Sequence, residues 1–329
     1  MQGLTPKFNG IKFLRRKIPM ALLFICHGED PNLWKSALHK EMDNIDIRVW
    51  PHSIGNPEEI EVALAWLPPP GLLANFQNLK AVLSLGAGVE HILADPSLPA
   101  EIPVARLIDP GLKSGMTEFV TMEVLRYHRY ERDYRIQQDL KNWHLLKQNL
   151  SRDCHIGILG LGLLGGACAT KLVDFEFPVS GWSQSAKDIK GVQSFSGESG
   201  LFSVLERSDI LICLLPLTPD TEDILDQTTL AALPSGAVII NAARGRHLVD
   251  QALIQLLDNG HLSGATLDVF REEPLPPEHP FWSHPKITVF PHAASWSLPS
   301  SAAPVIAANI KRAQLGEKLF GQVDRNKGY

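Results

Sequence analysis

Three polar side chains in the C-terminal half of the chain each follow a short apolar run: Arg244, one of the adjacent acids Glu272 and Glu273, and His292. If those runs are neighbouring parallel strands, their carboxyl ends meet at one edge of a sheet, where such folds bind ligands. An imidazole there could transfer a proton, a carboxylate could orient it, and a guanidinium could bind an anionic substrate. Taken singly, each residue has an ordinary structural explanation, since the chain holds 12 histidines. Taken together, the three predict one catalytic cleft.

A glycine-rich turn upstream predicts a second component of this cleft. The apolar run at residues 154–159 leads into a G-x-G-x-x-G sequence formed by Gly160, Gly162 and Gly165, and an apolar helical pattern follows. A strand, this turn and a helix in that order bind the pyrophosphate of a dinucleotide at the helix N-terminus. The alternative is a glycine-rich site where a helix packs closely. We predict dinucleotide binding.

The residues after the next expected strand bear on which dinucleotide binds. An acid at that position would bind the ribose 2′-hydroxyl of NAD. The chain instead has Ser183, Gln184 and Lys187, and its first acid is Asp188. Hydroxyl, amide and ammonium groups can donate hydrogen bonds to a 2′-phosphate, although the segment lacks an arginine for this purpose. NADP is therefore the favoured cofactor, and NAD is the alternative.

Short apolar runs alternate with amphipathic segments throughout the chain, which predicts an α/β fold with parallel sheets. Expected strands lie at residues 22–26, 47–50, 62–66, 81–85 and 104–107, and then at 154–159, 179–182, 210–215, 237–240, 265–268 and 287–290. Expected helices lie at 32–42, 71–76, 113–147 with a break near 139–143, 163–173, 200–206, 250–258 and 299–315. The last six strands are expected to form one doubly wound domain.

The first third of the chain is too short to close off alone, so the last helix and the tail are expected to return to it. The prediction is two doubly wound parallel-sheet domains, with a Rossmann cofactor domain inserted into a flavodoxin-like substrate domain. The substrate domain would comprise residues 1–112 and 294–329. The dinucleotide-binding domain would comprise residues 113–293.

Composition and charge exclude several classes of protein. The 329 residues, 44% of them apolar, suffice for two packed domains. A net charge of −5 argues against a nucleic-acid partner, and the longest apolar run, at 18–26, is too short to cross a membrane. The cysteines stand singly, without metal-ligand spacing, and are expected to be buried thiols in a reducing, cytoplasmic compartment. They are Cys26, Cys154, Cys168 and Cys213.

The first nineteen residues differ from the rest, since they contain five lysines and arginines and no acid. A basic segment before an apolar run faintly resembles a signal peptide, but no small-residue cleavage site follows. A natural start at Met20 is the favoured interpretation.

These separated motifs, in this order, resemble the D-isomer-specific 2-hydroxyacid dehydrogenase family, and more narrowly its glyoxylate/hydroxypyruvate reductase A group. The resemblance extends from Met20 to Tyr329 and includes residues 63–69 and 321–325. It implies a reductase that uses NADPH to convert glyoxylate and hydroxypyruvate, both small 2-keto acids, to glycolate and glycerate. Two alternatives are an NAD-dependent dehydrogenase of another D-2-hydroxy acid and a non-catalytic, dinucleotide-sensing protein on the same scaffold.

The resemblance also implies roles for individual residues. His292 would donate a proton to the keto oxygen, and Glu273, which directly precedes a proline, would orient His292, with Glu272 as the neighbouring alternative. Arg244 would bind the substrate carboxylate. Further substrate contacts are implied for Trp66 and for the glycine-loop residues Ala87, Gly88 and Val89. The implied cofactor-binding residues are Gly160, Gly162, Leu163, Leu164, Gly165, Ser183, Gln184, Lys187, Leu215, Pro216, Thr218, Ala242 and Asp268.

Three further expectations concern the pocket and the assembly. Arg271 would add a second positive group to the pocket. Trp296 stands where many members of the family have smaller residues, which bears on the shape of the pocket. Residues 119–143 correspond to the region through which members of the family form homodimers, so a homodimer is expected.

Overall fold

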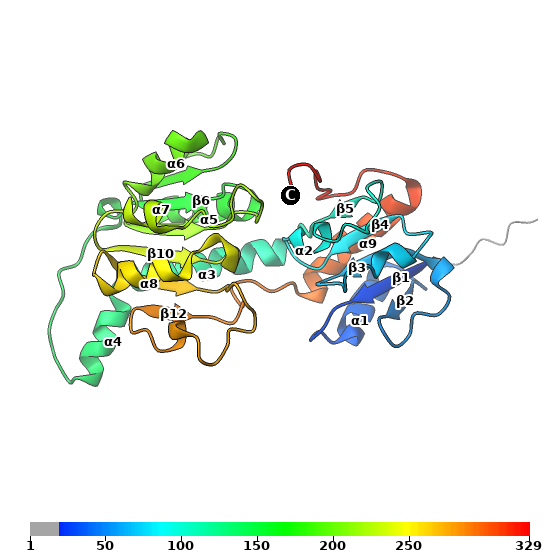
Figure 1. The fold of residues 1–329 in the computed structure, drawn as a ribbon, viewed down its shortest axis with the longest axis horizontal. Coiled ribbons are helices and arrows are strands. Elements are labelled where there is room, and N and C mark those ends of the chain that lie inside the picture. The colour runs from blue at the N-terminus through cyan, green and yellow to red at the C-terminus, as the bar shows by residue number, and fades with distance from the viewer. Residues whose placement is uncertain (1–19) are drawn as a thin grey trace, which may run out of the picture.

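The computed structural model describes residues 20–329, which form two lobes, each built on a parallel β-sheet (Figure 1). Within these residues the first sheet has the strand order β2-β1-β3-β4-β5, and the second has the order β12-β11-β10-β9-β6-β7-β8. The strands of the first sheet are β1 Ala21–Ile25, β2 Asp46–Val49, β3 Ile60–Ala65, β4 Ala81–Ser84 and β5 Val104–Ala105. Those of the second are β6 Ile156–Leu159, β7 Val179–Trp182, β8 Val192–Phe195, β9 Ile210–Cys213, β10 Ala237–Asn241, β11 Leu262–Leu267 and β12 Ile287–Val289.

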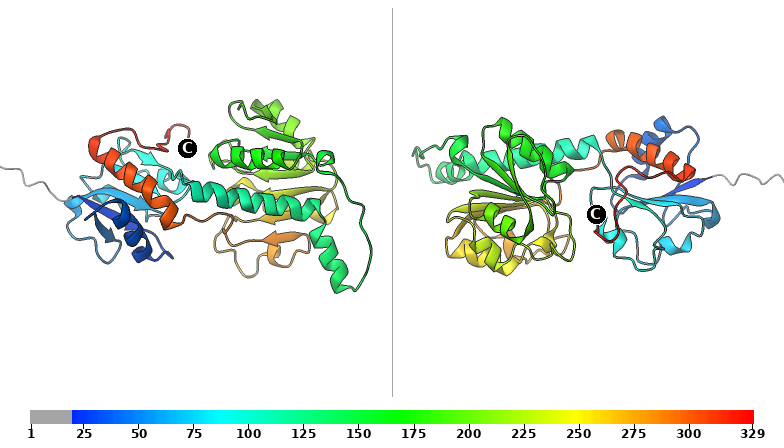
Figure 2. Two further views of the ribbon diagram at one scale, coloured as in Figure 1. Left: turned by 180° about the vertical axis from the view of Figure 1, so that it is seen from behind. Right: turned by 90° about the horizontal axis from the view of Figure 1, so that it is seen from above.

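Helices connect the strands and cover the sheets (Figure 2). The α-helices are α1 Pro31–Glu41, α2 Glu90–Leu93, α3 Pro110–His128, α4 Glu131–Asp139, α5 Leu163–Asp174, α6 Gly197–Leu205, α7 Gln227–Ala231, α8 Asp250–Asp258 and α9 Pro299–Leu315. Short 3₁₀ turns are η1 Pro57–Glu59, η2 Leu73–Asn75, η3 Ser151–Asp153, η4 Gly245–His247 and η5 Pro280–Trp282. The expected α/β fold with two parallel sheets is confirmed, and each expected strand is present. The prediction of a helix at 71–76 is wrong, because only the single turn η2 forms there.

The first lobe is built from both ends of the described chain. Its core joins Leu22 and Phe24 of β1 to Trp34 of α1 and to Ala303 and Ile306 of α9. Asp30 precedes helix α1 and caps it, because its carboxylate accepts the Asn32 N–H at 2.9 Å. Helix α9 ends at a glycine in the left-handed conformation, which favours helix termination.

The second lobe has seven strands rather than the six expected. The additional strand, β8, has the sequence VQSF and lies at the edge of the sheet, paired in parallel with β7. Its residues are partly or fully exposed, so it lacks the apolar run by which the other strands were predicted. Helix α7 is also absent from the prediction, since its five residues are too few to show a helical period.

The long helix expected at 113–147 is two helices, and the break was placed too late. Helix α3 ends at His128, and Tyr130 adopts the left-handed conformation with a φ of 56°. Helix α4 then ends at Asp139. Buried residues of α3, among them Phe119 and Val120, pack with residues of α5, and Glu123 accepts a hydrogen bond from the Thr266 hydroxyl at 2.8 Å. The Glu123 contact fixes α3 against the sheet of the second lobe.

The predictions for the cysteines are confirmed only in part. All four cysteines are free thiols, but only Cys154, Cys168 and Cys213 are buried, so the expectation for Cys26 is wrong. Burial raises the pKa of the Cys213 thiol to about 12. The expectations for residues 1–19 lie outside the described residues. Within residues 20–329, no helix has the length and apolar character needed to cross a membrane.

Candidate active site

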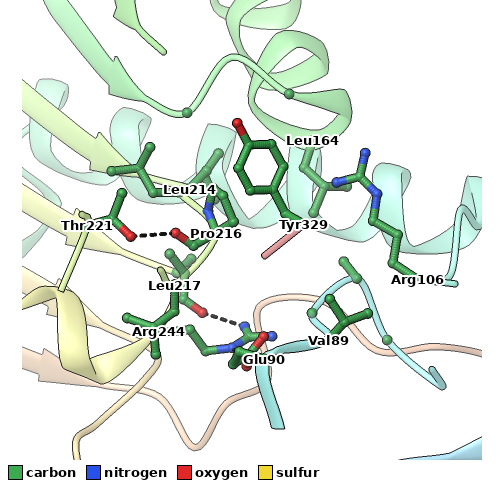
Figure 3. Close-up of a pocket in the computed structure, with 18 of the residues that line it drawn as sticks. Val89, Glu90, Arg106, Leu164, Leu214, Pro216, Leu217, Thr221, Arg244 and Tyr329 are labelled. Atoms are coloured by element: carbon green, nitrogen blue, oxygen red, sulfur yellow. Dashed lines mark hydrogen bonds and ion pairs between the residues drawn. The ribbon is translucent and has the colours of Figure 1, made fainter. Parts of the chain in front are cut away.

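A cavity of about 1450 Å³ lies between the two lobes, and residues of both lobes line it. The lining, some of which is drawn in Figure 3, contains nearly all the residues predicted above for catalysis, substrate binding and cofactor binding. Arg271 and the alternative Glu272 lie outside it. The first lobe contributes Trp66, Ala87, Gly88 and Val89. The second contributes Gly160, Gly162, Leu163, Leu164, Gly165, Ser183, Gln184, Lys187, Leu215, Pro216, Thr218, Ala242, Arg244, Asp268, Glu273 and His292.

Strand order explains why three residues distant in sequence meet in this cavity. Strands β10, β11 and β12 are neighbours in the sheet and run in parallel. Arg244, Glu273 and His292 follow the carboxyl ends of these strands in turn. The structure therefore brings them to one sheet edge, where doubly wound folds bind ligands.

His292 and Glu273 form a hydrogen-bonded pair. The imidazole Nδ1 lies 2.7 Å from Glu273 Oε2, and the backbone N–H of Phe270 donates to Oε1 at 2.9 Å. Burial acts to raise the pKa of Glu273, but the hydrogen bonds from His292 and Phe270 outweigh it and lower that pKa. Because an ionised carboxylate only accepts, Nδ1 carries the proton and Nε2 is left for a ligand. Glu272, the alternative partner, is exposed and lies outside the cavity lining.

Asp268 holds the backbone that carries His292. Its Oδ1 accepts the N–H groups of Ala293 at 2.7 Å and Ala294 at 3.0 Å, and its carbonyl accepts the His292 N–H at 2.8 Å. Burial raises the pKa of Asp268, although the N–H groups of Ala293 and Ala294 oppose that rise. His292 has a φ of 53°, an uncommon conformation for a residue with a side chain. The sequence did not predict that Asp268 would stabilise this turn.

Arg244 forms an ion pair that bridges the two lobes. Its Nε donates to Oε1 of Glu90, at the start of α2 in the first lobe, and its Nη1 donates to the Ala243 carbonyl at 2.6 Å (Figure 3). Burial acts to raise the pKa of Glu90. The hydrogen bond with His91 and the charge of Arg244 hold that pKa far below its usual range. Glu90 is thus a charged partner of Arg244 that sequence reasoning missed.

A buried histidine fixes the backbone of Arg244. Nδ1 of His247 accepts the Arg244 N–H at 3.2 Å, while Nε2 lies 3.3 Å from the Pro216 carbonyl. Burial lowers the pKa of His247 to about 4, so the ring is neutral near pH 7. A neutral ring can accept at Nδ1 and donate at Nε2, as this geometry requires.

The glycine loop of the first lobe lies directly against Arg244 and Trp66. A Cβ added to Gly88 would stand 1.7 Å from Nη2 of Arg244, and a Cβ on Gly86 would stand 2.7 Å from the Trp66 ring. The Ser84 hydroxyl donates to the Gly88 carbonyl at 2.7 Å and holds the loop in place. Glycine is therefore required at both positions for the guanidinium and the indole to approach the loop.

Arg271 does not join the pocket, so that expectation is wrong. Its guanidinium pairs with Asp223, and its Nε donates to the Leu248 carbonyl at 2.8 Å. Those partners direct Arg271 away from the cavity, whose lining does not include it. Trp296, in contrast, lines the cavity and is exposed to it.

The glycine turn after β6 has the shape that a dinucleotide requires. Gly160 has a φ of 101°, and a Cβ on Gly165 would stand 1.8 Å from the Gly160 carbonyl oxygen. A Cβ on Gly162 would meet no atom within 4 Å, and no side chain caps the N-terminus of α5. Backbone N–H groups of the helix start therefore face open space, as diphosphate binding requires.

Polar side chains line the cavity beyond the end of β7. The Ser183 hydroxyl donates to the Ser185 carbonyl at 2.8 Å, and Lys187 Nζ donates to the Ser185 hydroxyl at 2.9 Å. The Tyr329 hydroxyl donates to Gln184 from the other lobe. This corner can donate hydrogen bonds to an anion. No cluster of three or more histidines, cysteines or acids that could hold a metal is found among residues 20–329.

A Rossmann-type sheet facing a second α/β lobe across a cleft with an acid–base pair defines a two-domain, nicotinamide-dependent dehydrogenase. The family model described as "D-isomer specific 2-hydroxyacid dehydrogenase, NAD binding domain" matches residues 121–294. The chain belongs to this family of enzymes.

Three solved structures are similar over nearly the whole chain. A D-isomer specific 2-hydroxyacid dehydrogenase from Xanthobacter autotrophicus Py2, in complex with NADPH and MES, is 41% identical, covers 94% of this chain and 100% of its own, and has a TM-score of 0.91. An NADPH-dependent glyoxylate/hydroxypyruvate reductase from Sinorhizobium meliloti, in complex with NADP and sulfate, is 35% identical, with coverages of 94% and 100% and a TM-score of 0.88. A probable 2-hydroxyacid dehydrogenase from Rhizobium etli CFN 42, with NADP, HEPES and L(+)-tartaric acid, is 32% identical, with coverages of 94% and 99% and a TM-score of 0.86.

Proposed function

We propose that this enzyme reduces glyoxylate and hydroxypyruvate with NADPH, forming glycolate and glycerate. The observation that carries the proposal is the hydrogen-bonded pair of His292 and Glu273, which lines the same cavity as Arg244 and the glycine turn. The similar Sinorhizobium meliloti protein is a glyoxylate/hydroxypyruvate reductase, and all three solved relatives hold NADP or NADPH. These relatives support the choice of substrate and cofactor.

The residues of the cavity supply the chemistry around one keto group. When bound, NADPH supplies a hydride for the 2-keto carbon. As an imidazolium, protonated on both nitrogens, His292 delivers its Nε2 proton to the keto oxygen, which becomes the hydroxyl of the product, and the ring keeps its Nδ1 proton. Glu273 accepts the Nδ1 hydrogen bond, which orients the ring and stabilises the charge of the imidazolium. Arg244 and the N–H groups of residues 87–89 hold the substrate carboxylate and so orient the keto carbon.

A direct assay tests the proposal. Purified protein mixed with NADPH and glyoxylate, or with hydroxypyruvate, should lose absorbance at the wavelength of the reduced nicotinamide. Parallel reactions with NADH and with bulkier 2-keto acids separate this activity from the NAD-dependent alternative. The absence of turnover with either substrate and either cofactor, across neutral pH, would contradict the proposal.

Cofactor preference gives a sharper prediction at Ser183. The variant Ser183→Asp should lower kcat/KM with NADPH by about tenfold or more, because a carboxylate repels the 2′-phosphate. The variant should retain most of its activity with NADH, whose 2′-hydroxyl can donate to the new acid. Ser183→Asn, which has a similar size and no charge, is the control, and steady-state kinetics with both cofactors is the measurement. An equal loss with NADH and NADPH would show that the 2′-phosphate does not bind near Ser183.

The proposal also includes a homodimer. Large apolar side chains are exposed on α4 and on the segment after it, which projects from the second lobe (Figure 1). They are Ile136, Leu140, Trp143, Leu145 and Leu150, and Trp143 is 102% exposed. Monomeric proteins rarely leave so many neighbouring apolar side chains in water.

Sedimentation of the purified protein tests the dimer directly. The wild-type chain should sediment at about twice the monomer mass. The double variant Trp143→Ser with Leu145→Ser should shift towards the monomer, because it removes the two most exposed apolar side chains of the segment. Leu315→Ser, a change at a 72% exposed leucine at the end of α9 in the first lobe, is the matched control and should remain dimeric. A wild-type monomer at micromolar concentration would contradict the proposal.

A cytoplasmic location is part of the same proposal. The four cysteines are free thiols, and such thiols persist in reducing compartments. Fractionation of cells that produce the protein would test the location.

A further inference from the structure

Arg106 is a cationic side chain that the proposed chemistry does not use. It follows β5 in the first lobe, is partly buried and lines the cavity between the lobes. Among residues 20–329, no carboxylate or carbonyl oxygen accepts a hydrogen bond from its guanidinium, unlike Arg244 or Arg271. Figure 3 shows the guanidinium directed towards Leu164 of α5, in the second lobe.

The surface that Arg106 faces is itself electropositive. Leu164 belongs to the first turn of α5, where the unpaired N–H groups and the helix dipole give a positive potential. A partly buried guanidinium directed at a positive helix start is unfavourable unless an anion lies between them. The diphosphate of a dinucleotide bound at the glycine turn would be that anion.

The C-terminal segment of the same lobe also reaches the second lobe beside this site. Arg106 N–H donates to the Gly321 carbonyl at 3.0 Å, and Val323 N–H donates to the Val104 carbonyl at 2.9 Å, so the segment runs along β5. A turn follows, in which the N–H groups of residues 327 and 328 both donate to the Asp324 carbonyl at 3.0 Å. Tyr329 is thereby placed to donate its hydroxyl hydrogen bond to Gln184.

We propose that the first lobe completes the dinucleotide site: Arg106 binds the cofactor diphosphate opposite the helix start, and Tyr329 positions Gln184 beside the adenosine ribose. This inference rests on the proposed use of NADPH. Cofactor binding then involves both lobes, so NADPH holds the cavity in the arrangement that brings Arg244, from the second lobe, against the glycine loop of the first.

Titration with NADPH tests the role of Arg106. The variant Arg106→Gln should weaken NADPH binding by about 10- to 100-fold, the expected loss for a hydrogen bond between charged groups. The affinity of the variant for NADH, which has the same diphosphate, should fall by a similar factor. Arg106→Lys, which keeps the charge but not the planar fork, should give an intermediate loss. Quenching of tryptophan fluorescence by each nucleotide gives the Kd.

Two controls separate binding from folding and from net charge. Arg152→Gln removes the same charge at an exposed position outside the cavity and should leave the Kd unchanged. Without nucleotide, Arg106→Gln should melt at the wild-type Tm, whereas its stabilisation by NADPH should be smaller. Tyr329→Phe should weaken NADPH binding by about three- to tenfold, since it loses one neutral hydrogen bond.

The outcomes distinguish this inference from the proposed function. If the wild-type protein binds neither NADPH nor NADH, the proposed function and the inference fail together. If the wild-type protein binds and oxidises NADPH but Arg106→Gln and Arg106→Lys keep its Kd, only the inference is overturned. A raised KM for glyoxylate with an unchanged NADPH Kd would also overturn it, because Arg106 would then contact the substrate.

Discussion

Replacing His292 with asparagine should lower kcat for glyoxylate reduction by about 10²- to 10⁴-fold, the usual contribution of a positioned general acid. The NADPH Kd should stay near that of the wild type, because the glycine turn and the end of β7 are untouched. Asparagine can still donate a hydrogen bond to Glu273, so the turn that Asp268 holds should persist. Pre-steady-state measurement of NADPH oxidation would report the chemical step directly.

A second histidine–carboxylate pair provides the control for His292. His284 Nε2 lies 3.2 Å from Asp258 Oδ1, and neither residue lines the cavity. His284→Asn should therefore leave kcat unchanged. Glu273→Gln should lower kcat less than His292→Asn, since it removes the orienting charge but leaves the proton donor. If His292→Asn kept wild-type kcat, proton transfer would have to be assigned to another group.

Local sequence signals identified much of the site. The glycine turn formed by Gly160, Gly162 and Gly165 lies between a strand and a helix. Because all of its residues are close together in the chain, the sequence alone was enough to recognise it. The rule that ligands bind at the carboxyl ends of parallel strands brought Glu273 and His292 together. The choice of Glu273 over Glu272 came from the resemblance to a family, and the structure places only Glu273 beside the imidazole.

Contacts between the lobes left no comparable signal in the sequence. Glu90 and Arg244 are 154 positions apart, and Tyr329 lies 145 positions from Gln184. Such pairs depend on how the two lobes face each other, which no periodic pattern encodes. The break at Tyr130 was missed for a different reason: helical spacing of apolar residues continues past it, and a single left-handed residue does not alter that spacing.

Replacing Arg244 should produce the second large effect, and its hydrogen bonds indicate which part of the guanidinium is available to substrate. Nε is bonded to Glu90 and Nη1 to the Ala243 carbonyl. Nη2 stands over Gly88, next to the loop N–H groups proposed to bind the substrate carboxylate. Glu90 therefore holds the guanidinium so that Nη2 faces Gly88, where the substrate carboxylate is proposed to bind.

The variant Arg244→Ala should raise the KM for glyoxylate and lower kcat, with a combined loss in kcat/KM of about 10³-fold, since it removes a charge-assisted hydrogen bond and leaves Glu90 without its cationic partner. Arg244→Lys should recover only part of this loss, because an ammonium cannot bond Glu90, Ala243 and the substrate in the same planar geometry. Glu90→Gln should raise the KM with little change in the NADPH Kd.

Arg271→Lys is the matched control for Arg244, because Arg271 forms comparable bonds to Asp223 and Leu248 outside the cavity. It should show wild-type kinetics. Measuring KM and kcat separately distinguishes two roles for Arg244. If the arginine only joined the two lobes, its loss would change mainly the thermal stability and the NADPH affinity, and the KM for the 2-keto acid would change little. Wild-type kinetics in Arg244→Ala would remove this residue from substrate binding.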